Sequence, residues 1–202
     1  NACTAGFDDI NTNPYEVTKK ELNRDGYNIN SYMIGLQSTI ATSAPHLNQF
    51  AGQLMGGNWG RYTADSNPGF NHKNFASYKP TDGWIKPIFA DNITNTFKEM
   101  GGLEAATDNK VLLSVALICK VASLHRVTDI FGPMPYSRVG EDGKLQIPYY
   151  SQEQVYKRMF KELDSAITVL ADKKNINERF SLKANKVYDS EIRRWVKFAN
   201  AL

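Results

Sequence analysis

Aromatic and polar side chains gather in one glycine-containing stretch of this sequence, and together they could bind a sugar. The stretch reads Asn58-Trp59-Gly60-Arg61-Tyr62, and Tyr78 follows it further along. The apolar face of a pyranose ring packs on a flat aromatic ring, while its hydroxyl groups bond to amide and guanidinium groups. We therefore predict a ligand-binding site formed by Asn58, Trp59, Arg61, Tyr62 and Tyr78.

The same residues leave two other interpretations open. A peptide could occupy the site, with Arg61 pairing to a carboxylate. Alternatively, Trp59 and Tyr62 could simply cover the helix ends beneath them. The segment 71–75, Asn-His-Lys-Asn-Phe, carries a similar mixture of ring and amide groups and could extend the site.

The sequence gives no positive reason to expect catalysis, a metal ion or a cofactor. The histidines His46, His72 and His125 are far apart and belong to no cluster with metal-ligand spacing. No phosphate-binding loop, dinucleotide fingerprint or nucleophile elbow is present. Acidic pairs such as Asp8-Asp9 fall in evident loops, and one sequence cannot show two carboxylates facing each other across a cleft. We therefore predict a binding protein and not an enzyme.

Composition places the chain among ordinary globular proteins. Its 202 residues are 42% apolar and 22% charged. The net charge is +3, and the basic residues are too thinly spread along the chain to predict nucleic-acid binding. The apolar run Val111–Val127 is short for a membrane span and is interrupted by Lys120, so we interpret it as a buried core helix. Cys119 lies within that run and is expected to be a small buried side chain.

Helical periodicity recurs along the chain, and no segment has a convincing strand period. Ser151 and Gln154 form a capping box before one apolar stripe, and Gly101-Gly102 is expected to end an earlier helix. Residues 58–83 have no clear period and are interpreted as a long functional loop. The helices near 108–127 and 152–171 each need a neighbour and could stack as an antiparallel, tetratricopeptide-like pair. Helices are predicted over about 32–40, 45–57, 84–100, 108–127 and 151–170, and from about 189.

The segment Thr128–Ser137 forms a rigid exit from the apolar helix, because Gly132, Pro133 and Pro135 restrict the backbone there. It presents Phe131 and Tyr136 at a fixed place. The segment resembles the "D-x-(F/Y)-G-x-(I/M)-P-Y-S" stretch of SusD/RagB-like outer-membrane lipoproteins. Further resemblances follow in Phe7–Pro14 after Cys3, in Tyr149–Tyr156, in Glu162–Ile167 and in Trp195–Leu202, where Ala201 replaces the family's usual serine.

The resemblance implies an all-α fold of tetratricopeptide-like helix pairs with long irregular loops. It also implies a protein of the outer membrane, exposed at the cell surface and lipid-anchored through Cys3. Residues 1–17 would then be the segment next to the anchor, and 18–202 the N-terminal part of a SusD-like helical domain. The implied partner is a SusC-like TonB-dependent transporter, and the implied ligand an oligosaccharide or, second, an oligopeptide. A glycan hydrolase and a helical scaffold without a ligand are the remaining alternatives.

Leu202 falls within a helical pattern that carries no stop signal, whereas members of that family continue beyond the matching point. We therefore expect a fragment of a longer protein. On that basis Trp195, Val196 and Phe198 are predicted to lack part of their packing and to expose an apolar patch.

Overall fold

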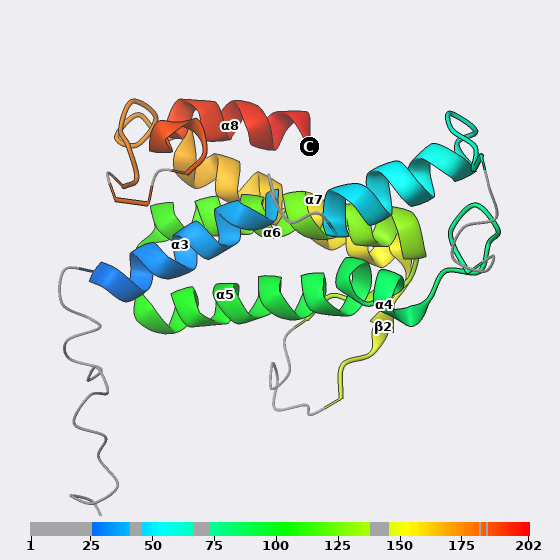
Figure 1. Cartoon of the computed structure of the whole chain (residues 1–202). Helices are drawn as coiled ribbons and strands as arrows, with labels where there is room; N and C mark the ends of the chain where they lie inside the picture. Colours follow the sequence, from blue (N-terminus) through cyan, green and yellow to red (C-terminus); the bar gives the residue numbers. More distant parts are fainter. Residues whose placement is uncertain (1–25, 41–45, 67–72, 138–145, 182, 185) are drawn as a thin grey trace, which may run out of the picture.

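The computed structural model describes residues 26–40, 46–66, 73–137, 146–181, 183–184 and 186–202. The described chain is helical, as predicted, apart from two short strands that pair antiparallel, with Met134 opposite Tyr150 (Figure 1). Strands of two residues are too short to leave a period in the sequence. The elements are α3 (Tyr27–Ile40), η2 (His46–Gly57), α4 (Asp82–Ile85), η4 (Pro87–Asp91), α5 (Asn92–Ala106), α6 (Lys110–Phe131), β1 (Met134–Pro135), β2 (Tyr149–Tyr150), α7 (Gln152–Leu170), η6 (Tyr188–Ser190) and α8 (Ile192–Ala201).

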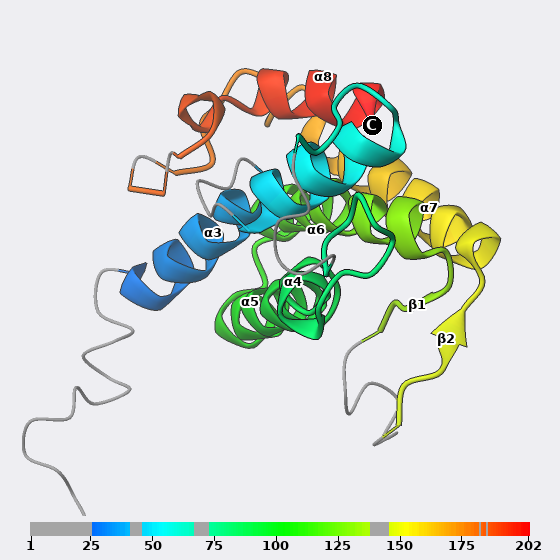
Figure 2. The same cartoon turned by 45° about the vertical axis from the view of Figure 1, so that its right-hand side comes forward.

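Helix α6 is the centre of the fold and contacts α3, α5, α7 and α8. Helices α5 and α8 lie on opposite sides of it (Figures 1 and 2). Asn109 caps its N-terminus by accepting hydrogen bonds from the backbone N–H groups of Val111 and Leu112. The helix runs one turn further than the sequence suggested, to Phe131. It is thus long and apolar enough to cross a membrane, but 72% of its most apolar stretch is buried, which identifies a core helix.

Helices α6 and α7 form the antiparallel pair that the sequence predicted. The side chain of Gln152, at the start of α7, donates to the carbonyl of Thr128 near the end of α6. Further along α7, Glu162 contacts Lys120, which lies two turns earlier on α6. The predicted capping box at the start of α7 is confirmed, because the Ser151 and Gln154 side chains each accept from the other's backbone N–H.

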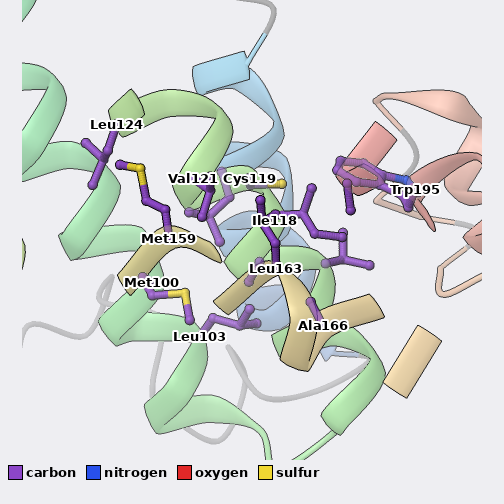
Figure 3. Packing of buried hydrophobic residues seen from close by; sticks show 14 of the residues in the cluster. Met100, Leu103, Ile118, Cys119, Val121, Leu124, Met159, Leu163, Ala166 and Trp195 are labelled. Atoms are coloured by element: carbon purple, nitrogen blue, oxygen red, sulfur yellow. The ribbon is translucent and has the colours of Figure 1, made fainter. Parts of the chain in front are cut away.

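The main hydrophobic core lies around α6, where α3, α5, α7 and α8 pack together, and Figure 3 shows part of it. Burial raises the pKa of the Cys119 thiol well above its usual range, so this cysteine is a small apolar core residue and not a nucleophile. The core residues labelled in Figure 3 are Met100, Leu103, Ile118, Cys119, Val121, Leu124, Met159, Leu163, Ala166 and Trp195.

The exit from α6 holds its two aromatic rings against the protein. Gly132 has a φ of 74°, a left-handed conformation that favours glycine, and its N–H bonds to the carbonyl of Thr128. Phe131 packs edge-on against Phe89 with ring centroids 5.0 Å apart. Tyr136 is buried and its hydroxyl donates to Glu162 at 2.8 Å. Burial, and then the charge of Glu162, raise the pKa of Tyr136 well above its usual value, which keeps this hydroxyl a donor.

The expectation that Gly101-Gly102 ends a helix is wrong, because α5 continues through both glycines to Ala106. The glycines serve close packing instead. A Cβ atom at Gly102 would overlap the ring of Tyr32 on α3, with the ring Cζ only 2.6 Å away. The absence of a side chain therefore lets α3 and α5 approach each other.

We expect Gly102→Ala to lower the free energy of unfolding by about 1–3 kcal/mol, because overlap with Tyr32 outweighs the gain in helix propensity. Urea denaturation measures the change. The control is Gly52→Ala in η2, where a Cβ would meet no atom within 4 Å, so stability should stay equal or rise. An equal gain from both substitutions would contradict close packing at Gly102.

The predicted exposure of Trp195 is also wrong. This side chain is 0% exposed, and Val196 and Phe198 are half-buried. The ring of Trp195 packs edge-on against the rings of Phe180, Tyr188 and Phe198, with centroids 5.7 to 6.1 Å away. Two of these rings come from the irregular segment between α7 and α8. That segment, and not a later helix, covers the tryptophan.

Candidate functional site

The site predicted from the sequence begins where η2 ends. The chain reverses there through hydrogen bonds from the N–H groups of Gly60 to the carbonyl of Gly56 and of Tyr62 to that of Gly57, both at 2.9 Å. A Cβ atom at Gly60 would lie 2.7 Å from the carbonyl oxygen of Gly56, so only glycine fits this close approach. Arg61 follows with a left-handed φ of 61°. The tight turn places Arg61 and Tyr62 at the protein surface.

Trp59 and Tyr78 form a stacked pair of rings beside this turn. Their centroids are 5.7 Å apart and their planes differ by 16°. The indole N–H of Trp59 donates to the carbonyl of Phe75 at 2.7 Å, which fixes the ring in place. Trp59 remains 42% exposed and Tyr78 72% exposed. Residues far apart in sequence thus form one exposed aromatic surface.

A second, smaller hydrophobic cluster supports this surface from beneath. Phe75 is buried in it together with Met55 and Ile88. Phe75 also contacts the ring of Trp84, which in turn stacks on Phe50. Phe75, which contacts the exposed ring of Trp59, is therefore packed against residues of η2, α4 and η4.

An open pocket of about 570 Å³ lies beside the turn. Three residues of the predicted site line it, namely Asn58, Arg61 and Tyr62. Tyr62 is 89% exposed, so it does not cover a helix end. The pocket combines a positive guanidinium with a negative carboxylate and an aromatic ring, which suits a polar ligand. Its full lining is Asn58, Arg61, Tyr62, Thr63, Ala64, Asp65 and Ala76.

Sequence reasoning missed Asp65. Its Oδ2 atom accepts a hydrogen bond from Nδ2 of Asn74 at 2.9 Å. Asn74 is only 7% exposed, and its Oδ1 atom accepts from the N–H of Ser77 at 2.8 Å. A buried amide thus holds the carboxylate at the pocket wall. No local sequence signal marks Asp65, because its anchor lies nine residues later in the chain.

Asn58 lines the pocket and also stabilises the turn, whereas His125 does not line the pocket. The amide of Asn58 is engaged within the turn, donating to Leu54 and accepting from Thr63. His125 contacts the carbonyl of Val121 through Nδ1, as a core-helix residue would. Cys3 and His72 lie outside the described residues. Within the described ranges, no group of three His, Cys, Asp or Glu side chains is placed to hold a metal ion.

A second hollow of similar volume lies between α5 and the β1–β2 hairpin. Its walls include Phe89, Ile93, Phe97, Pro135 and Ile147, so it is almost entirely apolar. Three polar residues, Thr94, Lys98 and Ser137, also line it, but its surface is mainly apolar, whereas a sugar or a peptide backbone requires several converging polar groups. The pocket beside the 57–63 turn is therefore the better candidate for a polar ligand.

Comparison with known proteins confirms the family resemblance. The family described as "SusD and RagB outer membrane lipoprotein" matches residues 9–202. A SusD homolog from Bacteroides ovatus is 35% identical, with a TM-score of 0.76. The match covers 88% of this chain and 35% of the homolog's chain. A SusD homolog from Bacteroides thetaiotaomicron is 32% identical, with a TM-score of 0.71 over 83% of this chain and 34% of its own.

A chitin-binding SusD homolog from Flavobacterium johnsoniae is 28% identical, with a TM-score of 0.71 over 85% of this chain and 36% of its own. The comparison with curated proteins finds no match. The chain spans about a third of the length of these solved structures. Over nearly its whole length it matches both the sequence pattern and the helical architecture of one group of proteins, and it therefore belongs to the SusD-like family of outer membrane lipoproteins.

Proposed function

We propose that the protein captures oligosaccharides at the surface of the outer membrane for uptake by a SusC-like TonB-dependent transporter. The observation that carries this proposal is the exposed stacked pair Trp59 and Tyr78. The pair does not itself line the polar pocket, but the two residues that follow Trp59 after Gly60, Arg61 and Tyr62, do. Flat rings next to hydrogen-bonding side chains match the two faces of a sugar. The chitin-binding homolog, which shares the fold, supports a glycan as the ligand class.

Backbone conformation supports a functional role for this surface. Arg61 has a φ of 61° and Tyr78 a φ of 56°, and both are non-glycine residues in the left-handed region. Each such residue costs on the order of 1 kcal/mol and persists only where its surroundings enforce it. Five described non-glycine residues have a positive φ. Arg61 and Tyr78 belong to the candidate site, and Tyr188, Asp189 and Ser190 form η6.

The family description also supports attachment to the outer membrane. We propose that Cys3 carries the lipid, that residues 1–17 connect the anchor to the helical part, and that 18–202 form the N-terminal part of a SusD-like helical domain. The same family membership supports a SusC-like transporter as partner. It also favours a binding role over a catalytic one, because the solved relatives are SusD homologs, one of them described as chitin-binding.

We expect Tyr62→Ala to weaken oligosaccharide binding by the intact protein about fivefold or more, because a stacked ring contributes on the order of 1 kcal/mol. Trp59→Ala should weaken binding at least as much, since it removes both a ring and the bond that fixes it to Phe75. Calorimetry against a panel of oligosaccharides and oligopeptides measures both effects, with circular dichroism to verify unchanged helix content.

Tyr27→Ala is the matched control, because Tyr27 is 63% exposed on α3 and lies outside the pocket. The affinity of this variant should equal that of the wild type.

Arg61→Ala distinguishes between the two ligand classes, oligosaccharide and oligopeptide. A peptide carboxylate would lose a bidentate charged pair, whereas a neutral sugar should lose less. Unchanged affinity for the true ligand in all three site variants would refute the site. Binding of oligopeptides alone would favour the peptide alternative.

A further inference from the structure

The pocket beside the 57–63 turn contains one positive and one negative side chain that form no salt bridge with each other. Arg61 and Asp65 both line it, and no ion pair joins these two residues. Asp65 is held by the amide of Asn74 through Oδ2, and its Oδ1 atom accepts from no group in the described part of the chain. A ligand in the pocket therefore meets a guanidinium that can only donate and a carboxylate that can only accept.

This pair of groups distinguishes ligands by their hydrogen-bonding capacity. A sugar hydroxyl both donates and accepts, so an uncharged polyhydroxyl ligand can satisfy Arg61 and Asp65 together. A carboxylate on the ligand can only accept. It would satisfy Arg61 but place a like charge against Asp65, which is a repulsive element of the kind that produces specificity.

We propose that Asp65 is a specificity-determining residue that makes this pocket select uncharged glycans over acidic ones. The inference rests on the proposed function and narrows its ligand class. Asn74 acts as a positioning residue, because its side chain is buried and its amide fixes one carboxylate oxygen. The remaining oxygen is then preorganised to accept from a ligand hydroxyl, and such a charge-assisted bond is about twice as strong as a neutral one.

The test uses the intact protein and matched pairs of oligosaccharides. Each pair combines an uncharged manno-, galacto-, gluco- or N-acetylated chito-oligosaccharide with its counterpart oxidised to the uronate at C6. The wild type should bind the uncharged member more tightly. Asp65→Asn keeps the size of the side chain, and its amide oxygen can still accept the hydrogen bond from Asn74. The substitution removes only the negative charge. We expect it to weaken binding of the uncharged member about fivefold and to narrow or reverse the preference over the uronate.

Asp164→Asn on α7 is the control, because it removes the same charge from an exposed residue that does not line the pocket. Its preference should equal that of the wild type. An unchanged preference in folded Asp65→Asn would overturn the assignment of Asp65, as would a wild type that prefers the uronates. In either case glycan binding itself would stand. If the wild type binds no oligosaccharide of either kind, the proposed function fails as well.

Discussion

Replacing Trp195 by alanine is expected to lower the free energy of unfolding by about 3–5 kcal/mol, the range for a large aromatic removed from a core. The side chain is fully buried and contacts three other rings, from Phe180, Tyr188 and Phe198. Its removal would leave a cavity beneath α8 and separate that helix from the segment that precedes it. Urea denaturation measures the loss as a lower midpoint with an unchanged slope.

Trp195→Phe is the informative companion variant. The indole Nε1 atom is buried and has no hydrogen-bond partner among the described residues. A buried donor without an acceptor costs about 1–3 kcal/mol, so its removal offsets part of the packing that phenylalanine loses. Trp195→Phe should therefore be clearly more stable than Trp195→Ala. If the alanine variant stays within about 1 kcal/mol of the wild type, α8 does not depend on this ring.

The case of Trp195 shows what sequence patterns could not supply. The helical stripe of α8 was recognisable, because its apolar residues recur at helical spacing. The partners of that stripe were not, since Phe180 lies in an irregular segment and Tyr188 in the three-residue helix η6, and both are too short to show a period. An expectation based on helix pairing alone therefore placed the missing partner beyond Leu202. Tertiary contacts made by loops leave no periodic signal.

The glycines of α5 illustrate a second limit. Two adjacent glycines are a usual stop signal, and local reasoning ended the helix there. The structure uses Gly102 for close approach to Tyr32 on another helix, a contact between residues 70 positions apart. The helix signals with local causes were more reliable. The capping box at Ser151 and the antiparallel pair of α6 and α7 were both predicted correctly.

Some residues of the candidate site are likewise marked by a local sequence pattern, and one is not. Trp59, Arg61 and Tyr62 could be proposed from the sequence because ring and guanidinium groups are adjacent there, and in the structure Tyr78 stacks on Trp59. That these residues bind a ligand stays a prediction. Asp65 could not be proposed in that way, because an aspartate in a loop is ordinarily solvated. Asp65 becomes a candidate only in the folded chain, where the buried amide of Asn74 holds its carboxylate at the wall of a pocket.

A partly buried ion pair joins the two central helices, α6 and α7, and its disruption is expected to have the second large effect on stability. Nζ of Lys120 lies 2.6 Å from Oε1 of Glu162, with side chains 10% and 23% exposed. Nζ also lies 4.7 Å from the centre of the Tyr136 ring, a cation–π contact. Lys120→Met is expected to lower the free energy of unfolding by about 3 kcal/mol, because it leaves a partly buried carboxylate without its counter-charge.

The double variant Lys120→Met/Glu162→Gln tests that cause. Methionine fills the space of the lysine stem, and the glutamine oxygen can still accept from the hydroxyl of Tyr136, so no unpaired charge remains. Replacement of a whole buried pair is often neutral, whereas removal of one partner is destabilising. We therefore expect the double variant to recover most of the stability that Lys120→Met loses, as measured by urea denaturation. A double variant as unstable as Lys120→Met would show instead that the unpaired carboxylate is not the cause, and that the loss comes from the contact of the ammonium group with the ring of Tyr136.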